Sequence, residues 1–95
     1  MESTITSEKL QQYFSITKEA LSKAKQALDT SRKAQAEDFL DMASRYVDDA
    51  DYFLIQKKDA VLAFAALNYA HGWLDAGARI GLFKVKDSRL FAVDE

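Results

Sequence analysis

The chain has 95 residues and a formal net charge of −2, and it contains neither cysteine nor proline. This length suits one domain with one core and leaves no room for a separate catalytic lobe. The lack of cysteine excludes a disulfide framework and a thiolate metal site. A hydrophobic fraction of 48% is too high for a disordered chain, so we expect a single folded domain over residues 1–95.

The sequence favours a cytoplasmic protein without a membrane span. The longest uninterrupted apolar run, Ala60–Leu67, is far shorter than the ~20 residues that cross a bilayer. Residues 1–5 have neither the basic start nor the apolar centre of a secretory signal. A pI of about 5.4 gives no general attraction to nucleic acid or anionic membranes.

The first predicted helix covers roughly residues 7–28. Apolar and small side chains recur between Leu10 and Leu28 at alternating spacings of four and three, which is the repeat of one helix face. Thr6 or Ser7 precedes this run and can cap the helix.

Two more helices are predicted, over about residues 34–56 and 60–82, followed by a mixed tail over 83–95. Lys57 and Lys58 suit the C-terminal end of the second helix, and Asp59 can cap the third. Gly81 can permit the third helix to end. Short connections between antiparallel helices predict an all-α, up-and-down three-helix bundle.

Three segments carry a resemblance to a known family: Tyr46–Phe53, Ala63–Ala66 and Tyr69–Gly77. Together they resemble an uncharacterised, mainly archaeal family catalogued as domain of unknown function 357, over roughly residues 8–85. The resemblance implies a small three-helix bundle of the albumin-binding-module type. It implies no activity, ligand, cofactor or catalytic residue.

The third helix is apolar over an unusually wide arc of roughly 220° at about 100° per residue. One flank of this arc carries Leu62, Tyr69, Trp73 and Ile80. A helix enclosed by two neighbours needs such an arc for packing alone. The alternative is that this flank is a candidate interaction surface for a partner or a second copy, because aromatic side chains are enriched at binding hot spots.

The tail is too apolar to be freely solvated, since it contains Leu90, Phe91 and Val93. We expect these side chains to fold onto the Leu62, Tyr69, Trp73 and Ile80 flank or to compete there with a partner. Leu90 and Phe91 are therefore included in the candidate interaction surface.

A candidate polar seam consists of Asp49, His71 and Asp75. His71 and Asp75 are four residues apart on one helix and could share a metal ion or form an acid/base pair. One histidine is too few for the usual zinc sites, however, and His71 falls within the apolar arc, so packing at the core edge is favoured. Ion pairs along each helix, or hydrogen bonds across helix seams from Asp49 or Asp75, explain the acidic members.

Basic residues along the first helix and the following turn suggest nucleic-acid binding as an alternative function. They are Lys18, Lys23, Lys25, Arg32 and Lys33. Helical angles scatter these cations, so a solvated surface is favoured over a phosphate track. No phosphate loop, nucleophile signature or metal-spaced cluster occurs in the sequence. The sequence therefore favours a non-catalytic protein-interaction module without a cofactor or metal, ahead of an RNA- or DNA-associated accessory protein and a metal-dependent enzyme.

Overall fold

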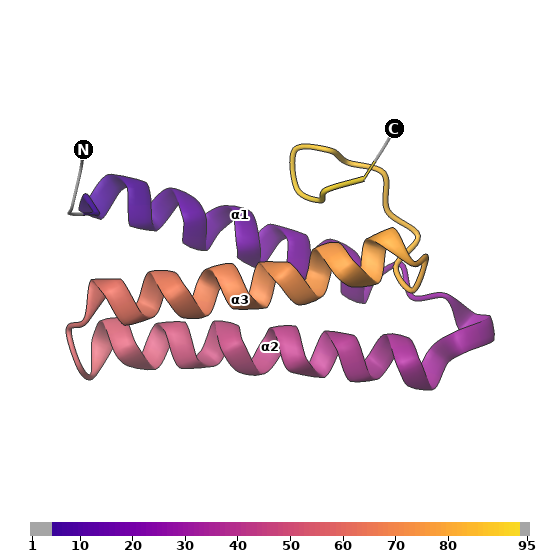
Figure 1. Cartoon of the computed structure of the whole chain (residues 1–95), viewed down its shortest axis with the longest axis horizontal. Coiled ribbons are helices and arrows are strands. Elements are labelled where there is room, and N and C mark those ends of the chain that lie inside the picture. Colours follow the sequence, from indigo (N-terminus) through magenta and orange to yellow (C-terminus); the bar gives the residue numbers. More distant parts are fainter. Residues whose placement is uncertain (1–4, 94–95) are drawn as a thin grey trace.

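The computed structural model describes residues 5–93 and confirms the predicted all-α three-helix bundle (Figure 1). The helices are α1 (Ser7–Lys25), α2 (Lys33–Ile55) and α3 (Ala60–Arg79), with a short 3₁₀ helix, η1 (Thr30–Arg32), between α1 and α2. Residues 80–93 form an irregular tail that folds back beside α1 and α3 (Figure 1).

Side-chain caps define where α1 and α3 begin. The Thr6 hydroxyl accepts a hydrogen bond from the Lys9 N–H at 3.1 Å, and the Asp59 carboxylate accepts one from the Leu62 N–H at 3.0 Å. Each satisfies one of the free N–H groups of a helix start. Both residues were predicted as caps from the sequence.

Both α1 and α3 end three residues earlier than predicted, because the chain leaves each helix to form backbone bonds between the α1–α2 connection and the tail. The Asp29 N–H donates to the Leu82 carbonyl at 2.8 Å, and the Lys84 N–H donates to the Ala27 carbonyl at 2.7 Å. Gly81 reverses the chain with a φ of +79°, a conformation that favours glycine. The end of α3 is thereby tied to the end of α1.

The helices approach one another closely because most of their fully buried positions are alanine. α3 lies between α1 and α2 and packs more extensively on α2 (Figure 1). The molecule measures 42 × 26 × 18 Å, and α1, α3 and α2 are spread across its broad face (Figure 1). The buried alanines are Ala20, Ala24, Ala36, Ala43, Ala50, Ala63, Ala66, Ala70 and Ala78.

The core divides into two clusters along the bundle. One is built around Leu10, Phe14 and Leu67, and all of its buried residues lie in the three helices. The other, at the end where the tail returns, adds four tail residues to the helices: Leu82, Phe83, Leu90 and Phe91. The tail is therefore part of the core rather than an appendage.

Gly77 on α3 is required by this tail packing. A Cβ atom at position 77 would lie 2.3 Å from the ring of Phe83, which is itself only 1% exposed. The ring thus rests directly on the backbone of α3.

Within residues 5–93, no helix combines the length and the apolar character that a membrane crossing requires.

Candidate functional site

The α2/α3 face carries an exposed apolar row, here called the α3 stripe, which consists of Leu62, Ala65, Tyr69, Gly72, Ala76 and Ile80. Leu62 is 46% exposed, Tyr69 57% and Ile80 51%. Solvent exposure of three large apolar side chains on one helix face is unusual, because such side chains lower the free energy of folding when buried. The structure brings together three of the six predicted interaction residues in this stripe.

Trp73 lies at the border of the α3 stripe. Its ring packs edge-on against Phe39 of α2, with centroids 5.0 Å apart, and the side chain is half-buried. Farther along the same border, the ring centroids of Tyr69 and Tyr46 lie 4.5 Å apart. These contacts to α2 fix the orientation of the aromatic side chains before any partner binds.

Two shallow hollows flank Tyr69. One has a volume of about 360 Å³ and is bordered by Tyr69, Gly72 and Trp73. The other, about 310 Å³, lies between α2 and α3 and is bordered by Tyr46, Phe53 and Leu62 among others. Both hollows are open and have a mainly apolar lining. Such hollows can receive protruding side chains of another protein.

The remaining two predicted interaction residues, Leu90 and Phe91, lie elsewhere. They are 1% and 2% exposed and belong to the core cluster at the tail end of the bundle. Of the two expectations for the tail, the first, that it folds onto the flank of Leu62, Tyr69, Trp73 and Ile80, is corrected by this placement: Leu62, Tyr69 and Ile80 remain exposed. The tail instead packs on the α1/α3 side, where polar groups on α3 hold its backbone.

We call this second region the tail clasp; it consists of Thr17, His71, Asp75 and the backbone of Leu90 and Ala92. Nε2 of His71 lies 2.6 Å from the Leu90 carbonyl oxygen, and Nδ1 lies 3.1 Å from the Thr17 hydroxyl. A neutral ring with its proton on Nε2 donates to the carbonyl and accepts from the hydroxyl, so both nitrogens are satisfied. Asp75 accepts a hydrogen bond from the Ala92 N–H at 2.9 Å.

The predicted polar seam is therefore divided. His71 and Asp75 come together, with Nε2 and Oδ1 3.7 Å apart, whereas Asp49 is exposed beside the α3 stripe. Sequence reasoning missed Thr17, a buried polar residue that is 2% exposed. Its only sequence signal is a hydroxyl on the buried face of α1, which demands a partner without indicating which one.

The geometry of the tail clasp also bears on the metal or acid/base alternative for His71 and Asp75. Both side chains already hold backbone groups of the tail. In the part of the chain that the structure describes, no group of three or more His, Cys, Asp or Glu side chains is arranged to hold a metal ion. His71 and Asp75 thus hold the backbone of the tail against the helices.

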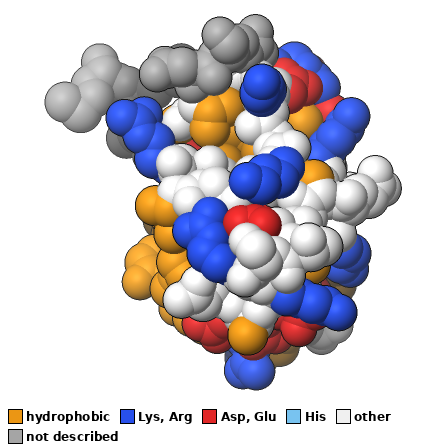
Figure 2. All heavy atoms as spheres, turned by 90° about the vertical axis from the view of Figure 1, so that its right-hand side faces the viewer, with side chains coloured by type: hydrophobic (Ala, Val, Ile, Leu, Met, Phe, Trp, Pro, Cys, Tyr) orange, Lys and Arg blue, Asp and Glu red, His pale blue; other side chains and the backbone are white. Residues whose placement is uncertain are grey.

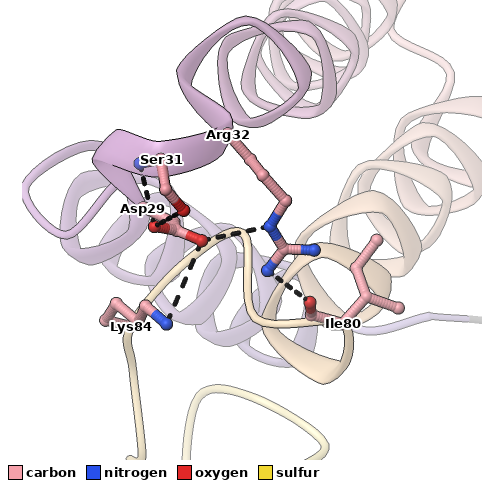
Figure 3. Close-up of polar contacts among 5 residues, drawn as sticks. All are labelled: Asp29, Ser31, Arg32, Ile80 and Lys84. Atoms are coloured by element: carbon pink, nitrogen blue, oxygen red, sulfur yellow. Dashed lines mark hydrogen bonds and ion pairs between the residues drawn. The ribbon is translucent and has the colours of Figure 1, made fainter.

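A second polar cluster lies where η1 meets the end of α3 (Figure 3). Asp29 accepts hydrogen bonds from the Ser31 hydroxyl at 2.8 Å, the Ser31 N–H at 3.1 Å and Arg32 Nε at 3.1 Å. These bonds, with a smaller contribution from the charge of Lys84, lower the pKa of the Asp29 carboxyl to about 2. Arg32 also donates to the Ile80 carbonyl at 2.8 Å, so the cluster joins η1 to the end of α3.

Basic side chains are spread over the end of the molecule where α1 ends and α2 begins (Figure 2). Several of the basic residues singled out from the sequence are engaged in ion pairs. Lys18 lies 3.2 Å from Asp51, Arg32 contacts Asp29, and Lys33 lies 3.8 Å from Glu37. The basic residues thus do not form a continuous row of free cations along α1.

A protein-family model covers most of the chain. The family model described as "Protein of unknown function (DUF357)" matches residues 12–83, which include most of α1 and all of α2 and α3. The matched region contains the whole α3 stripe and ends before Leu90 and Phe91. No curated protein and no solved structure matches the chain.

Proposed function

The chain belongs to the DUF357 family, and from this premise we propose that it is a small, non-catalytic protein-interaction module whose binding surface is the α3 stripe. The exposure of Leu62, Tyr69 and Ile80 on one helix face is the observation that supports the proposal. A monomeric protein that needed these side chains only for packing would bury them.

The contrast with the tail supports this choice of surface. The chain has enough apolar tail residues to cover one side of α3, and it places Leu90 and Phe91 on the α1/α3 side. The α3 stripe keeps its exposure even though Ile80 is itself the first residue of the tail. An aromatic side chain held in place by a neighbouring ring, as Tyr69 is by Tyr46, loses little conformational entropy on binding.

We propose a cytoplasmic location, because a cysteine-free composition suits a reducing compartment. Generic RNA or DNA should bind only weakly at physiological salt, and the binding should disappear as the salt concentration rises. Filter binding at increasing salt tests this expectation. Tight, salt-tolerant binding that is lost when Lys18 and Lys25 are replaced would favour a nucleic-acid role instead.

Site-specific photo-crosslinking in the native cell tests the interaction surface directly. A photoreactive phenylalanine analogue replaces Tyr69 in one variant and Ile55, which is 63% exposed on a different side of the bundle, in the matched control. We expect protein adducts from position 69 and none, or many fewer, from position 55. Equal adduct formation from both positions, or none from position 69, contradicts the proposed surface.

A further inference from the structure

The net charge of −2 conceals an uneven distribution of charge along the chain. Two segments, residues 22–33 and 79–86, together contain seven basic residues and one acidic residue, which gives them a net charge of +6. The other 75 residues have a net charge of −8. The basic residues of the two segments, here called the basic end, are Lys23, Lys25, Arg32, Lys33, Arg79, Lys84 and Lys86.

The fold brings these two segments together at one end of the bundle. The last turns of α1 and α3 and the first turn of α2 meet there (Figure 1), and the Lys84 N–H donates to the Ala27 carbonyl at 2.7 Å. Several basic side chains are spread over the face that this end presents (Figure 2). All members of the basic end are exposed except Arg32, whose guanidinium is held by Asp29 and the Ile80 carbonyl.

Ion pairs neutralise only part of the basic end. Arg32 and Lys84 share the carboxylate of Asp29, at 3.1 and 4.0 Å. Lys33 lies 3.8 Å from Glu37, on the next turn of α2. Within residues 5–93, the members without an ion pair to a carboxylate are Lys23, Lys25, Arg79 and Lys86.

Helix stability explains only some of these cations. Three members lie in the last turns of α1 and α3, where a cation interacts favourably with the helix dipole. Arg32 and Lys33 lie at the start of α2, whose first turn has no acidic residue, and a cation there is unfavourable to the dipole. Lys84 and Lys86 belong to the irregular tail. Four of the seven cations therefore have no role in stabilising a helix end.

The basic end has little exposed apolar surface. Of the large apolar side chains in residues 22–33 and 79–86, only Ile80 is exposed. Protein–protein interfaces have an apolar centre, whereas interfaces with nucleic acid are more polar and much more positively charged. Neither hollow of the α3 stripe is bordered by a basic residue. The composition of the basic end thus suits phosphate groups better than a second apolar contact.

We propose that the basic end binds the phosphate backbone of a nucleic acid, without recognition of the bases. Such binding is driven by counterion release and is independent of sequence. The net charge of −8 on the other residues repels a polyanion that lies along the helices. The contact is therefore confined to the end of the bundle, whose cross-section is no larger than 26 × 18 Å.

This inference goes beyond the proposed function, since no member of the basic end belongs to the α3 stripe. A contact made by a few cations alone is weak at physiological salt, which agrees with the expectation for generic RNA or DNA given above. The bundle would stand with one end on the phosphates and leave the α3 stripe open to a protein partner.

Fluorescence anisotropy with a short duplex DNA and a single-stranded RNA, at ~50 to ~200 mM salt, tests the proposal. If the four cations without ion pairs each contact one phosphate of the duplex, the plot of log affinity against log salt has a slope of about −3.6. The affinity should then fall roughly a hundredfold over this range. No binding at the lowest salt concentration, or a slope near zero, would overturn the proposal.

Two double variants with the same net charge test the position of the site. Lys25→Gln with Lys86→Gln should weaken binding at low salt roughly tenfold or more and make the slope less steep by about two. The matched control is Lys9→Gln with Lys57→Gln, at the opposite end of the bundle (Figure 1), and should bind like the parent chain. All four lysines are exposed, so the melting temperatures should stay close to that of the parent. Equal loss of affinity in both variants would overturn the site.

Other polyanions distinguish nucleic acid from the two competing partners. Poly-glutamate and vesicles of phosphatidylglycerol with phosphatidylcholine are added as competitors at equal concentrations of negative charge. We expect neither to displace the duplex. Displacement by poly-glutamate would assign an acidic protein segment to the basic end, and displacement by vesicles a membrane surface; either result overturns the proposal. The crosslinking result at position 69 does not depend on any of these outcomes, so the proposed function is tested separately.

Discussion

Two sides of α3 differ in how they are covered, although both are apolar enough to need a neighbour. On the α1/α3 side, the tail clasp supplies directional bonds from His71 and Asp75 to the backbone of the tail. On the α2/α3 side, the α3 stripe stays open with Asp49 exposed beside it, and Tyr69 is 57% exposed. Apolar burial drives a segment to a surface, but it is non-directional. The bonds from His71 and Asp75 hold the tail on the α1/α3 side.

The largest expected effect comes from removing the segment that the tail clasp holds. Deletion from Asp87 onward removes Leu90 and Phe91, and each such buried side chain contributes about 1.5–3 kcal/mol. We expect the free energy of unfolding to fall by about 3 kcal/mol or more, as measured by urea denaturation. Ile80→Ala, on the open side, should change it by no more than about 0.5 kcal/mol. Equal effects of the two changes would mean that the two sides do not differ as described.

A matched pair of glycines on α3 gives the next largest contrast. Gly77→Ala forces the buried Phe83 ring to move and should destabilise the protein by about 1–3 kcal/mol, despite the better helix propensity of alanine. Gly72→Ala meets open space and should stabilise it by about 0.5–1 kcal/mol. Thermal melting measures both. A stabilising Gly77→Ala would show that Phe83 does not rest on the backbone of α3.

Loss of the imidazole should weaken the tail clasp by an amount in the same range. His71→Ala leaves the Leu90 carbonyl and the Thr17 hydroxyl without their partner, which costs about 1–3 kcal/mol. Hydrogen exchange of the Ala92 amide should become faster in the same variant, since the tail loses one of the two α3 side chains that bond its backbone. Asp75→Asn retains an oxygen that can accept from the Ala92 N–H and should have a smaller effect. Unchanged exchange at Ala92 in His71→Ala would show that the ring does not hold the tail.

Acid should weaken the cluster around Asp29, and this is the smallest of the four predicted effects on stability. The carboxyl pKa is lowered from its ordinary value of 3.8 to about 2 in the folded chain. Its contribution to stability is therefore present above pH 4 and is lost as the pH falls through about 2. Asp29→Asn should remove this part of the acid dependence of the melting temperature. A variant that melts with the same pH profile as the parent chain below pH 4 would rule out this contribution.

Local patterns predicted the bundle because the helices depend on local rules. The repeat of apolar residues, Thr6 and Asp59 as caps, and Gly81 as the end of α3 are each set by neighbours within a few residues. The wide apolar arc of α3 also predicted that Leu62, Tyr69 and Ile80 share one flank.

The tail clasp could not be predicted in the same way, since its partners are far apart in the sequence. The apolar character of Leu90 and Phe91 indicated that the tail needs a surface, but the choice of side depends on Thr17, His71 and a backbone carbonyl. Likewise, the need for glycine at position 77 follows only from the place of the Phe83 ring. Such long-range contacts have no signature in the local pattern.

Hydroxyl-radical footprinting of the unmodified protein at two concentrations tests the difference between the two sides of α3 most directly. The account predicts rapid oxidation of Tyr69 and protection of Phe91 at both concentrations. Oxidation of Phe91 as fast as that of Tyr69 in dilute solution would contradict the claim that the tail covers one side of α3 and leaves the other open.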